Sequence, residues 1–178
     1  ANRARSVFAA DMDGDGDMDI LSASYNDDTI AWYENDGNAN PTFAATDIAA
    51  SADGAFSVFA ADMDGDGDMD IISASYNNDT IAWYENDGNA NPTWTAADIA
   101  TSADGAISVF AADMDGDGDM DILSASAVDN TIAWYETALA FTLTSSTPAT
   151  ASNTVSLDSN ITLTFDSPVK TSTLNASN

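Results

Sequence analysis

Cysteine and histidine are both absent from the 178 residues. Without cysteine the chain has no disulfide and no thiol nucleophile, and without histidine it lacks the commonest general base and a common zinc ligand. Ser-His and Cys-His nucleophilic pairs are therefore excluded. Glu34, Glu85 or Glu136 could pair with an aspartate for glycoside hydrolysis. Because the repeated copies single out no catalytic pair, we expect no enzymatic activity.

Positive charge is also scarce. The cationic side chains are Arg3, Arg5 and Lys170, against 30 Asp plus Glu, and the formal net charge is −27. Nucleic acid and anionic membrane surfaces carry charge of the same sign and would be repelled. No apolar run is long enough to span a bilayer. We therefore expect neither nucleic acid binding nor membrane insertion.

Hydrophobic residues make up 44% of the sequence and aromatic residues 9%, which argues against the disorder that high charge alone suggests. The length suffices for one or two domains, since a chain of 150 residues buries about 70% of its unfolded surface. The sequence begins at Ala1 without an initiating Met or a signal peptide, so we expect it to be a piece of a longer protein.

The dominant feature is the stretch Asp-Met-Asp-Gly-Asp-Gly-Asp-Met-Asp, which occurs at 11–19, 62–70 and 113–121. The copies start 51 residues apart, from 11 to 62 and from 62 to 113. The segments 6–56 and 57–107 differ only at Leu21/Ile72, Asp27/Asn78, Phe43/Trp94, Ala44/Thr95, Thr46/Ala97, Ala50/Thr101 and Phe56/Ile107. These segments are copies of one structural unit.

Five carboxylates in nine residues repel one another, by roughly 1 kcal/mol for a pair about 4 Å apart in water. Calcium would remove this cost, because it takes about 6 to 8 oxygen ligands and suits a loop with acids at alternate positions. We predict side-chain ligands at loop positions one, three, five and nine and a backbone carbonyl at position seven. About three Ca²⁺ ions would bind, one per loop. The predicted ligand residues are Asp11, Asp13, Asp15, Asp17, Asp19, Asp62, Asp64, Asp66, Asp68, Asp70, Asp113, Asp115, Asp117, Asp119 and Asp121.

Two other interpretations of these loops are weaker. A solvated acidic loop would explain one copy, but three identical copies with glycine at the same two places favour calcium. An EF-hand loop begins in the same way but needs a bidentate Glu at position twelve, where Ser22, Ser73 and Ser124 stand. The residues that follow lack a helical stripe, so the loops are predicted to join strands.

Each unit is predicted to contain four short strands, at 6–10, 20–25, 29–34 and 42–49 in the first copy. Four strands in a unit of this length are typical of a propeller blade. The inner strands are rich in Ala and Ser, as expected for a blade that packs between neighbours. The repeated Trp-Tyr pairs could stack on sugars, but we expect them in the core between blades, and we expect Tyr25 and Tyr76 to fill space.

The sequence resembles the FG-GAP or VCBS-type repeats of integrin α-like and bacterial secreted β-propellers. The loop matches three times, and the Trp-Tyr-Glu-Asn-Asp-Gly segment matches at 32–37 and 83–88. In the third copy Trp134-Tyr135-Glu136 runs into Thr137-Ala138-Leu139, so the last loop and strand are missing. The resemblance implies an all-β, calcium-stabilised partial propeller of about three four-stranded blades, the third incomplete, at 6–56, 57–107 and 108–137 within a domain 1–139.

The acidic character nearly disappears after Leu139, and Ser and Thr dominate 140–178. This segment resembles the opening strands of a bacterial Ig-like domain, and Ile161, Leu163 and Phe165 alternate as the buried face of a strand would. About 40 residues cannot complete a sandwich of roughly 100. We expect an incomplete Ig-like segment.

The expected function is non-catalytic recognition or adhesion, outside the cell or at its surface, where weak calcium modules work near 10⁻⁴ to 10⁻³ M. The alternative is a carbohydrate-binding propeller attached to a secreted polysaccharide-degrading enzyme. The expected partners are a protein or glycan ligand and the remaining blades of the parent chain. About three blades cannot close a ring of about 4 to 8, so we expect an open arc with exposed ends that is prone to self-association.

Overall fold

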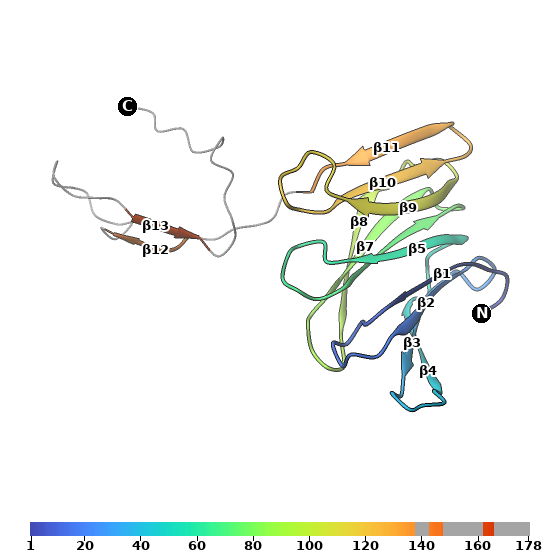
Figure 1. Ribbon diagram of the computed structural model, residues 1–178. Helices are drawn as coiled ribbons and strands as arrows, with labels where there is room; N and C mark the ends of the chain where they lie inside the picture. Colours follow the sequence, from blue (N-terminus) through green and yellow to red (C-terminus); the bar gives the residue numbers. More distant parts are fainter. Residues whose placement is uncertain (138–142, 148–161, 166–178) are drawn as a thin grey trace. The chain divides into compact units, whose positions relative to one another are not determined.

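The computed structural model describes residues 1–137, 143–147 and 162–165 (Figure 1). The chain divides into two compact units, Ala1–Thr137 and Ala138–Asn178. The described residues form strands and turns without helices, as the all-β prediction requires. None of them therefore offers a helix long and apolar enough to cross a membrane.

The first unit contains three antiparallel sheets, each of which takes its strands in chain order. The first sheet has four strands and the second repeats it, whereas the third has three described strands, in the order β11-β10-β9. The strands are β1 (Ala4–Ala10), β2 (Asp19–Ser24), β3 (Thr29–Asn35), β4 (Phe43–Ala49), β5 (Ala55–Ala61), β6 (Asp70–Ser75), β7 (Thr80–Asn86), β8 (Trp94–Ala100), β9 (Ala106–Ala112), β10 (Asp121–Ser126) and β11 (Thr131–Tyr135). The sequence-predicted strands of these sheets are confirmed, with ends shifted by one or two residues.

The register places each acidic loop at the tip of a hairpin. Ala10 pairs with Asp19, so residues 11–18 connect β1 to β2, and the same pairing recurs between Ala61 and Asp70 and between Ala112 and Asp121. We call residues 11–19, 62–70 and 113–121 the Asp loops. The three Asp loops lie along the same edge of the first unit (Figure 1).

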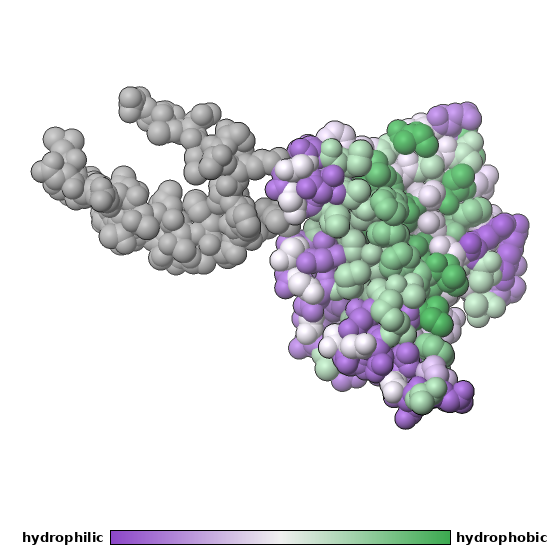
Figure 2. Space-filling view, viewed as in Figure 1, coloured by the Kyte–Doolittle hydropathy of each residue, from purple (hydrophilic) through white to green (hydrophobic). Residues whose placement is uncertain are grey.

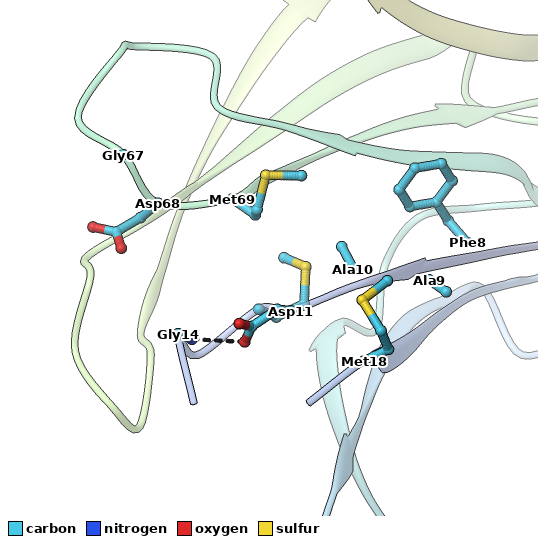
Figure 3. Close-up of a pocket in the computed structure, with 10 residues that line it drawn as sticks. Phe8, Ala9, Ala10, Asp11, Gly14, Met18, Gly67, Asp68 and Met69 are labelled. Carbon is cyan, nitrogen blue, oxygen red and sulfur yellow. Dashed lines mark hydrogen bonds between the residues drawn. The ribbon is translucent and has the colours of Figure 1, made fainter. Parts of the chain in front are cut away.

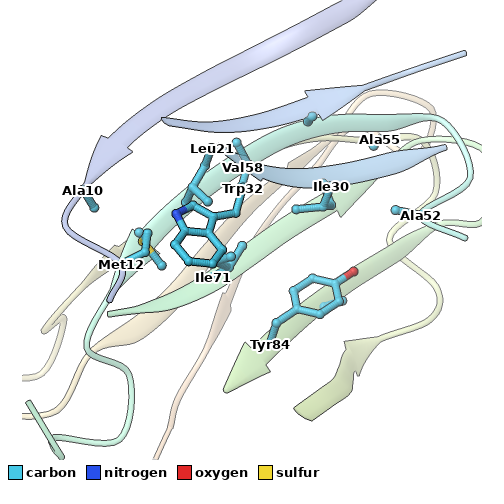
Figure 4. Packing of buried hydrophobic residues seen from close by; sticks show 13 residues of the cluster. Ala10, Met12, Leu21, Ile30, Trp32, Ala52, Ala55, Val58, Ile71 and Tyr84 are labelled. Carbon is cyan, nitrogen blue, oxygen red and sulfur yellow. The ribbon is translucent and has the colours of Figure 1, made fainter. Parts of the chain in front are cut away.

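The sheets pack face to face through small and branched side chains. One apolar cluster joins the first two sheets and a second joins the second and third. Leu21, Ile30 and Trp32 of the first sheet pack with Val58 and other residues of the second (Figure 4). Ala and Ser on both faces of β2, β6 and β10 let the sheets approach closely. The first unit is therefore an unclosed stack of propeller-like blades.

The prediction that the Trp-Tyr pairs lie in the core between blades is confirmed for Trp32, Trp83 and Tyr84. Trp32 is 5% exposed and Tyr84 6% exposed, and both belong to the cluster between the first two sheets. Trp83 packs against the second cluster. These aromatic side chains fill space between blades instead of facing solvent.

In the second unit, β12 (Leu143–Thr147) pairs antiparallel with β13 (Thr162–Phe165). Leu163 and Phe165 lie in β13, at the place where an Ig-like strand was predicted, and Ile161 lies outside the described residues. Thr147 pairs with Thr162, so the two strands form one ribbon of the predicted Ig-like segment.

Candidate metal centre

The backbone of each Asp loop turns sharply through its glycines. Gly14 and Gly16 have φ values of 74° and 96°, and the equivalent glycines of the other two loops are also positive. Non-glycine residues rarely adopt φ near 100°, so position six needs glycine for its backbone alone. The turn brings aspartates of the same loop close together.

The carboxylate of the first aspartate organises each loop. The N–H groups of Gly14 and Gly16 donate to Asp11 Oδ1 and Oδ2 at 2.9 and 3.0 Å. Asp13 accepts from the N–H of Asp15 at 3.2 Å, and Asp15 accepts from the N–H of Asp17 at 2.8 Å. The second loop repeats all four hydrogen bonds. The loop therefore folds around its own carboxylates.

These contacts bring acidic side chains into compact groups. Within each group, one carboxylate oxygen from each residue lies within 4.8 Å of the others. The groups are Asp11/Asp13/Asp15, Asp62/Asp64/Asp66, Asp113/Asp115/Asp121 and Asp115/Asp117/Asp119. Of the side chains at position nine, only Asp121 belongs to such a group in the described residues. The assignment of ligands from the sequence stays a prediction.

The last aspartate of each loop is buried and ties together three strands. Asp19 is 1% exposed and accepts hydrogen bonds from the N–H groups of Met12 (3.1 Å) and Asn35 (2.8 Å). Asp70 does the same with Met63 and Asn86, at 3.0 and 2.8 Å. A carboxylate has about four lone-pair sites, so two accepted hydrogen bonds leave others available. This side chain connects the start of the loop, the start of the second strand and the end of the third.

The seventh position of the loop touches a second loop of the same blade. A Cβ at Gly37 would lie 2.5 Å from Asp17 Oδ2, and a Cβ at Gly88 would meet the carboxylate of Asp68. Both glycines also have positive φ, 66° and 67°. The side chain of Asp17 thus faces the 35–41 loop, and its backbone carbonyl is the group predicted for a metal.

Burial and crowding shift the pKa values of several loop carboxylates. Burial raises the pKa of Asp13 and Asp64, and neighbouring carboxylates raise them further. Burial raises the pKa of Asp70 to about 6, although the N–H groups of Asn86 and Met63 oppose the shift. Without a cation, each of these groups therefore sits in surroundings that disfavour its negative charge.

Two further acidic positions have structural roles that the sequence analysis did not identify. Asp36 accepts a hydrogen bond from the Thr42 hydroxyl at 2.5 Å and from the Thr42 N–H at 3.1 Å, and Asp87 does the same with Thr93. The threonine side-chain hydrogen bond is the main cause that holds the pKa of both aspartates well below the ordinary range. An Asp followed six residues later by Thr in both copies was the available signal.

Each blade is also fastened to the next by an aspartate with positive φ. Asp28 (φ 56°) accepts from the N–H of Gly54 at 2.9 Å, and Asp79 (φ 58°) accepts from the N–H of Gly105 at 2.9 Å. Asn130 (φ 57°) occupies the third position. Asp and Asn tolerate this conformation better than most residues, which explains the choice.

Two hollows lie at the junction of the first two blades. One, of about 440 Å³, lies between two Asp loops and is lined by Phe8, Met18 and Met69 together with Asp11 and Asp68 (Figure 3).

The other hollow, of about 310 Å³, is lined by Arg3, Arg5, Tyr25, Phe56 and Tyr76. The guanidinium of Arg3 stands 4.6 Å from the Tyr25 ring centre and that of Arg5 4.8 Å from the Phe56 ring centre. The two arginines are the only cationic side chains in the described part of the chain. Tyr25 also donates to Asn77 Oδ1 at 2.9 Å, so its hydroxyl contacts the second blade.

Comparison with known protein families agrees with this geometry. The FG-GAP-like repeat family matches at residues 11–73 and 62–124, and the bacterial Ig-like domain family matches at 137–178. No curated protein and no solved structure gave a significant match. Such repeats and domains are typical of extracellular or surface proteins and are typically non-catalytic. The relation to VCBS repeats stays a prediction. Since the repeat matches together span more than half of the chain, the protein belongs to the FG-GAP-like repeat family and continues into a bacterial Ig-like domain.

Proposed function

We propose that the chain is a non-catalytic, extracellular recognition or adhesion module whose Asp loops bind calcium. The observation that carries the calcium proposal is the grouping of three carboxylate oxygens within 4.8 Å in each loop. Oxygens bound to one Ca²⁺ at about 2.3 to 2.6 Å lie no further than about 5 Å apart. The donor set consists of hard oxygens, as calcium requires, and histidine and cysteine are absent from the sequence.

The ion would be held by the aspartates at loop positions one, three, five and nine, with the carbonyl of position seven. A bound calcium ion would supply positive charge at the place where the aspartates repel one another. The buried aspartate at position nine accepts hydrogen bonds from the start of the loop and from the end of the third strand. An ion bound to this aspartate and to the other loop ligands would therefore stabilise the whole hairpin. Calcium is thus proposed to act as a structural ion.

Calorimetric titration and thermal unfolding test this proposal. In millimolar Ca²⁺ the melting temperature should rise well above its value in EDTA, because a ligand at a hundredfold over its Kd stabilises the native state by about 2.7 kcal/mol per site. Mg²⁺ should substitute poorly, since it demands octahedral geometry and keeps its waters. An unchanged melting temperature in EDTA would overturn the proposal.

A matched pair of variants assigns the effect to one loop. Asp64→Asn keeps an oxygen that can accept from the N–H of Asp66 but removes a ligand charge, so it should remove about one of the three calcium sites. Asp98→Asn makes the same change of charge in β8, outside the loops, and should leave the number of sites unchanged. Equal stoichiometry in the two variants would contradict the ligand assignment.

A glycan ligand is the alternative partner, and the arginine-aromatic hollow favours it. Tyr25, Phe56 and Tyr76 offer ring surfaces and Arg3 and Arg5 offer donors on one site. The third copy lacks two of these rings, since Ile107 and Ala127 stand at the equivalent positions. A glycan array probed with the unaltered chain and with Arg5→Ala distinguishes a glycan partner from a protein partner. Binding of discrete sugars by the unaltered chain that is lost in Arg5→Ala indicates carbohydrate binding. Absence of any bound sugar favours protein recognition.

A further inference from the structure

The same repeat positions are buried in two blades and exposed in the third. Met12 and Met63 are 1% and 3% exposed, whereas Met114 is 50% exposed. Ile30 and Ile81 are fully buried, whereas Ile132 is 79% exposed. We call the side of each sheet that carries these residues the forward face, because in the first two blades the next blade of the chain covers it.

The opposite side of the first sheet shows the reverse pattern. Val58 and Val109 are 3% and 5% exposed, whereas Val7, at the equivalent position, is 70% exposed. Val58 packs against the forward face of the first blade, and Val109 against that of the second. We call this side the backward face. The first unit therefore carries one uncovered forward face, on the third blade, and one uncovered backward face, on the first.

The two uncovered faces have the side chains that already pack together inside the chain. Met114, Leu123, Ile132 and Trp134 repeat the identities of Met12, Leu21, Ile30 and Trp32. On the other side, Ala4, Val7, Ala9, Ile20 and Tyr33 repeat the identities of Ala55, Val58, Ala60, Ile71 and Tyr84. The exposed fractions of Val7, Ile132 and Trp134 identify these end faces. In the view of Figure 2 a hydrophobic band also crosses the first unit between more hydrophilic borders.

We propose that the forward face of the third blade binds the backward face of the first blade of a second copy of this chain. The contact would reproduce the packing of the first blade on the second, in which the equivalent side chains form one buried apolar cluster. The side chains named on the two faces are uncharged. Asp47 lines a hollow with Tyr33 on the backward face, and its equivalent Asp98 lies near Tyr84 inside the chain, so the existing packing already accommodates an acidic side chain at this place. An exposed apolar patch of this kind marks an interaction site.

Polar contacts between blades support the same pairing. Asn86 Nδ2 donates to the carbonyl of Met12 in the preceding blade at 2.9 Å and to that of Met69 at 3.1 Å. Asn35, the equivalent residue of the first blade, donates to Met18 at 3.0 Å. In the proposed contact, Asn35 of one copy stands where it can reach the carbonyl of Met114 of the other.

The contact is head to tail, and so its geometry determines the size of the assembly. Such contacts either close into a ring or continue into a chain. Two copies bring together six blades, which falls within the range of about 4 to 8 found in closed propellers. A dimer with both contacts made is therefore the expected species.

Sedimentation equilibrium in millimolar calcium tests the proposal at protein concentrations up to about 500 µM, which covers dissociation constants in the micromolar range. The unaltered chain should form a dimer. Ile132→Asp and Val7→Asp each place a charge on one of the two faces, and each alone should weaken self-association at least about tenfold. Val128→Asp adds the same charge at a residue that is 52% exposed but outside both faces, and it should associate like the unaltered chain.

Mixing the two variants gives the decisive result. Val7→Asp retains its forward face and Ile132→Asp retains its backward face, so an equimolar mixture should form one-to-one dimers through this one intact contact, and more tightly than either variant associates alone. A cooperative thermal unfolding transition in each variant, at a melting temperature close to that of the unaltered chain at low protein concentration, establishes that both variants are folded. A strictly monomeric chain at the highest concentration overturns the proposal, as does association abolished by only one of the two substitutions. A mixture that stays monomeric also overturns it.

Discussion

At the scale of single residues, the three aspartates at loop position nine are the most deeply buried acidic side chains of their loops, each 1% exposed. Each carboxylate accepts two backbone hydrogen bonds, from the residue after the first aspartate and from the end of the third strand. A buried N–H that loses its acceptor costs about 1 to 3 kcal/mol. These residues should therefore affect stability even without calcium.

Asp70→Ala should lower the free energy of unfolding in EDTA by about 2 to 4 kcal/mol, because it leaves the N–H groups of Met63 and Asn86 without an acceptor. Asp66→Ala removes an exposed carboxylate that accepts a hydrogen bond from the N–H of Asp68, and it should cost less than about 1 kcal/mol. Urea unfolding of both variants in EDTA measures the difference. Equal losses would mean that the buried aspartate has no special role.

The hydrogen bonds between Asp87 and Thr93, in the segment that joins β7 to β8, give a prediction about pH. The Thr93 hydroxyl holds the pKa of Asp87 below its ordinary value, so this loop contributes stability above about pH 4 that is lost as the pH falls through the folded-state pKa. Thr93→Val should raise the pKa of Asp87 toward the model-peptide value of about 3.9. Carbon-detected NMR titration of the carboxyl group measures it. Thr93→Ser keeps the hydroxyl and should keep the low pKa; a normal pKa in this variant would contradict the assignment.

At the scale of strands and blades, periodicity and repetition allowed most of the fold to be predicted. The alternation of Ala, Ser and branched residues predicted the strands, and 51-residue spacing predicted equivalent blades. The register in which Asp19 accepts hydrogen bonds from both Met12 and Asn35 was not predictable, because it depends on how the third strand ends. The positive φ of Asp28 and Asp79 also carries no periodic signal. Sequence patterns predict which side of a strand is buried, whereas these contacts depend on how loops and strand ends meet in the folded protein.

The connection between blades can be tested at Asp79. Asp79→Ala removes the acceptor for the N–H of Gly105 and places alanine at positive φ, and it should destabilise the protein by about 1 to 3 kcal/mol. Asp79→Asn should cost much less, since Asn130 occupies the equivalent position with the same φ. Asn78→Ala, at the exposed neighbouring position, is the control. Denaturant unfolding compares the three, and a costly Asp79→Asn would show that charge matters more than conformation.

At the scale of the whole molecule, charge is the least balanced property. The net charge is −27, and the three Asp loops with their 15 aspartates lie along one edge of the first unit (Figure 1). Carboxylates within a Debye length of about 10 Å at 0.1 M salt repel one another, and the repulsion is relieved when the chain unfolds. The same field attracts divalent cations. Added salt should therefore have opposite effects on the metal-free and calcium-bound protein.

Raising NaCl from about 0.05 M to about 0.5 M shortens the Debye length to about 4 Å. In EDTA the melting temperature should rise, because screening weakens repulsion within and between the Asp loops. Calcium affinity should fall several-fold over the same range, because the negative potential that concentrates Ca²⁺ at this edge is screened. Scanning calorimetry and calcium titration at the two salt concentrations measure both effects. Choline chloride is the control, because it screens charge as NaCl does at the same concentration but supplies no Na⁺. If the melting temperature in EDTA rises with NaCl but not with choline chloride, Na⁺ binds in the loops and the screening explanation is wrong.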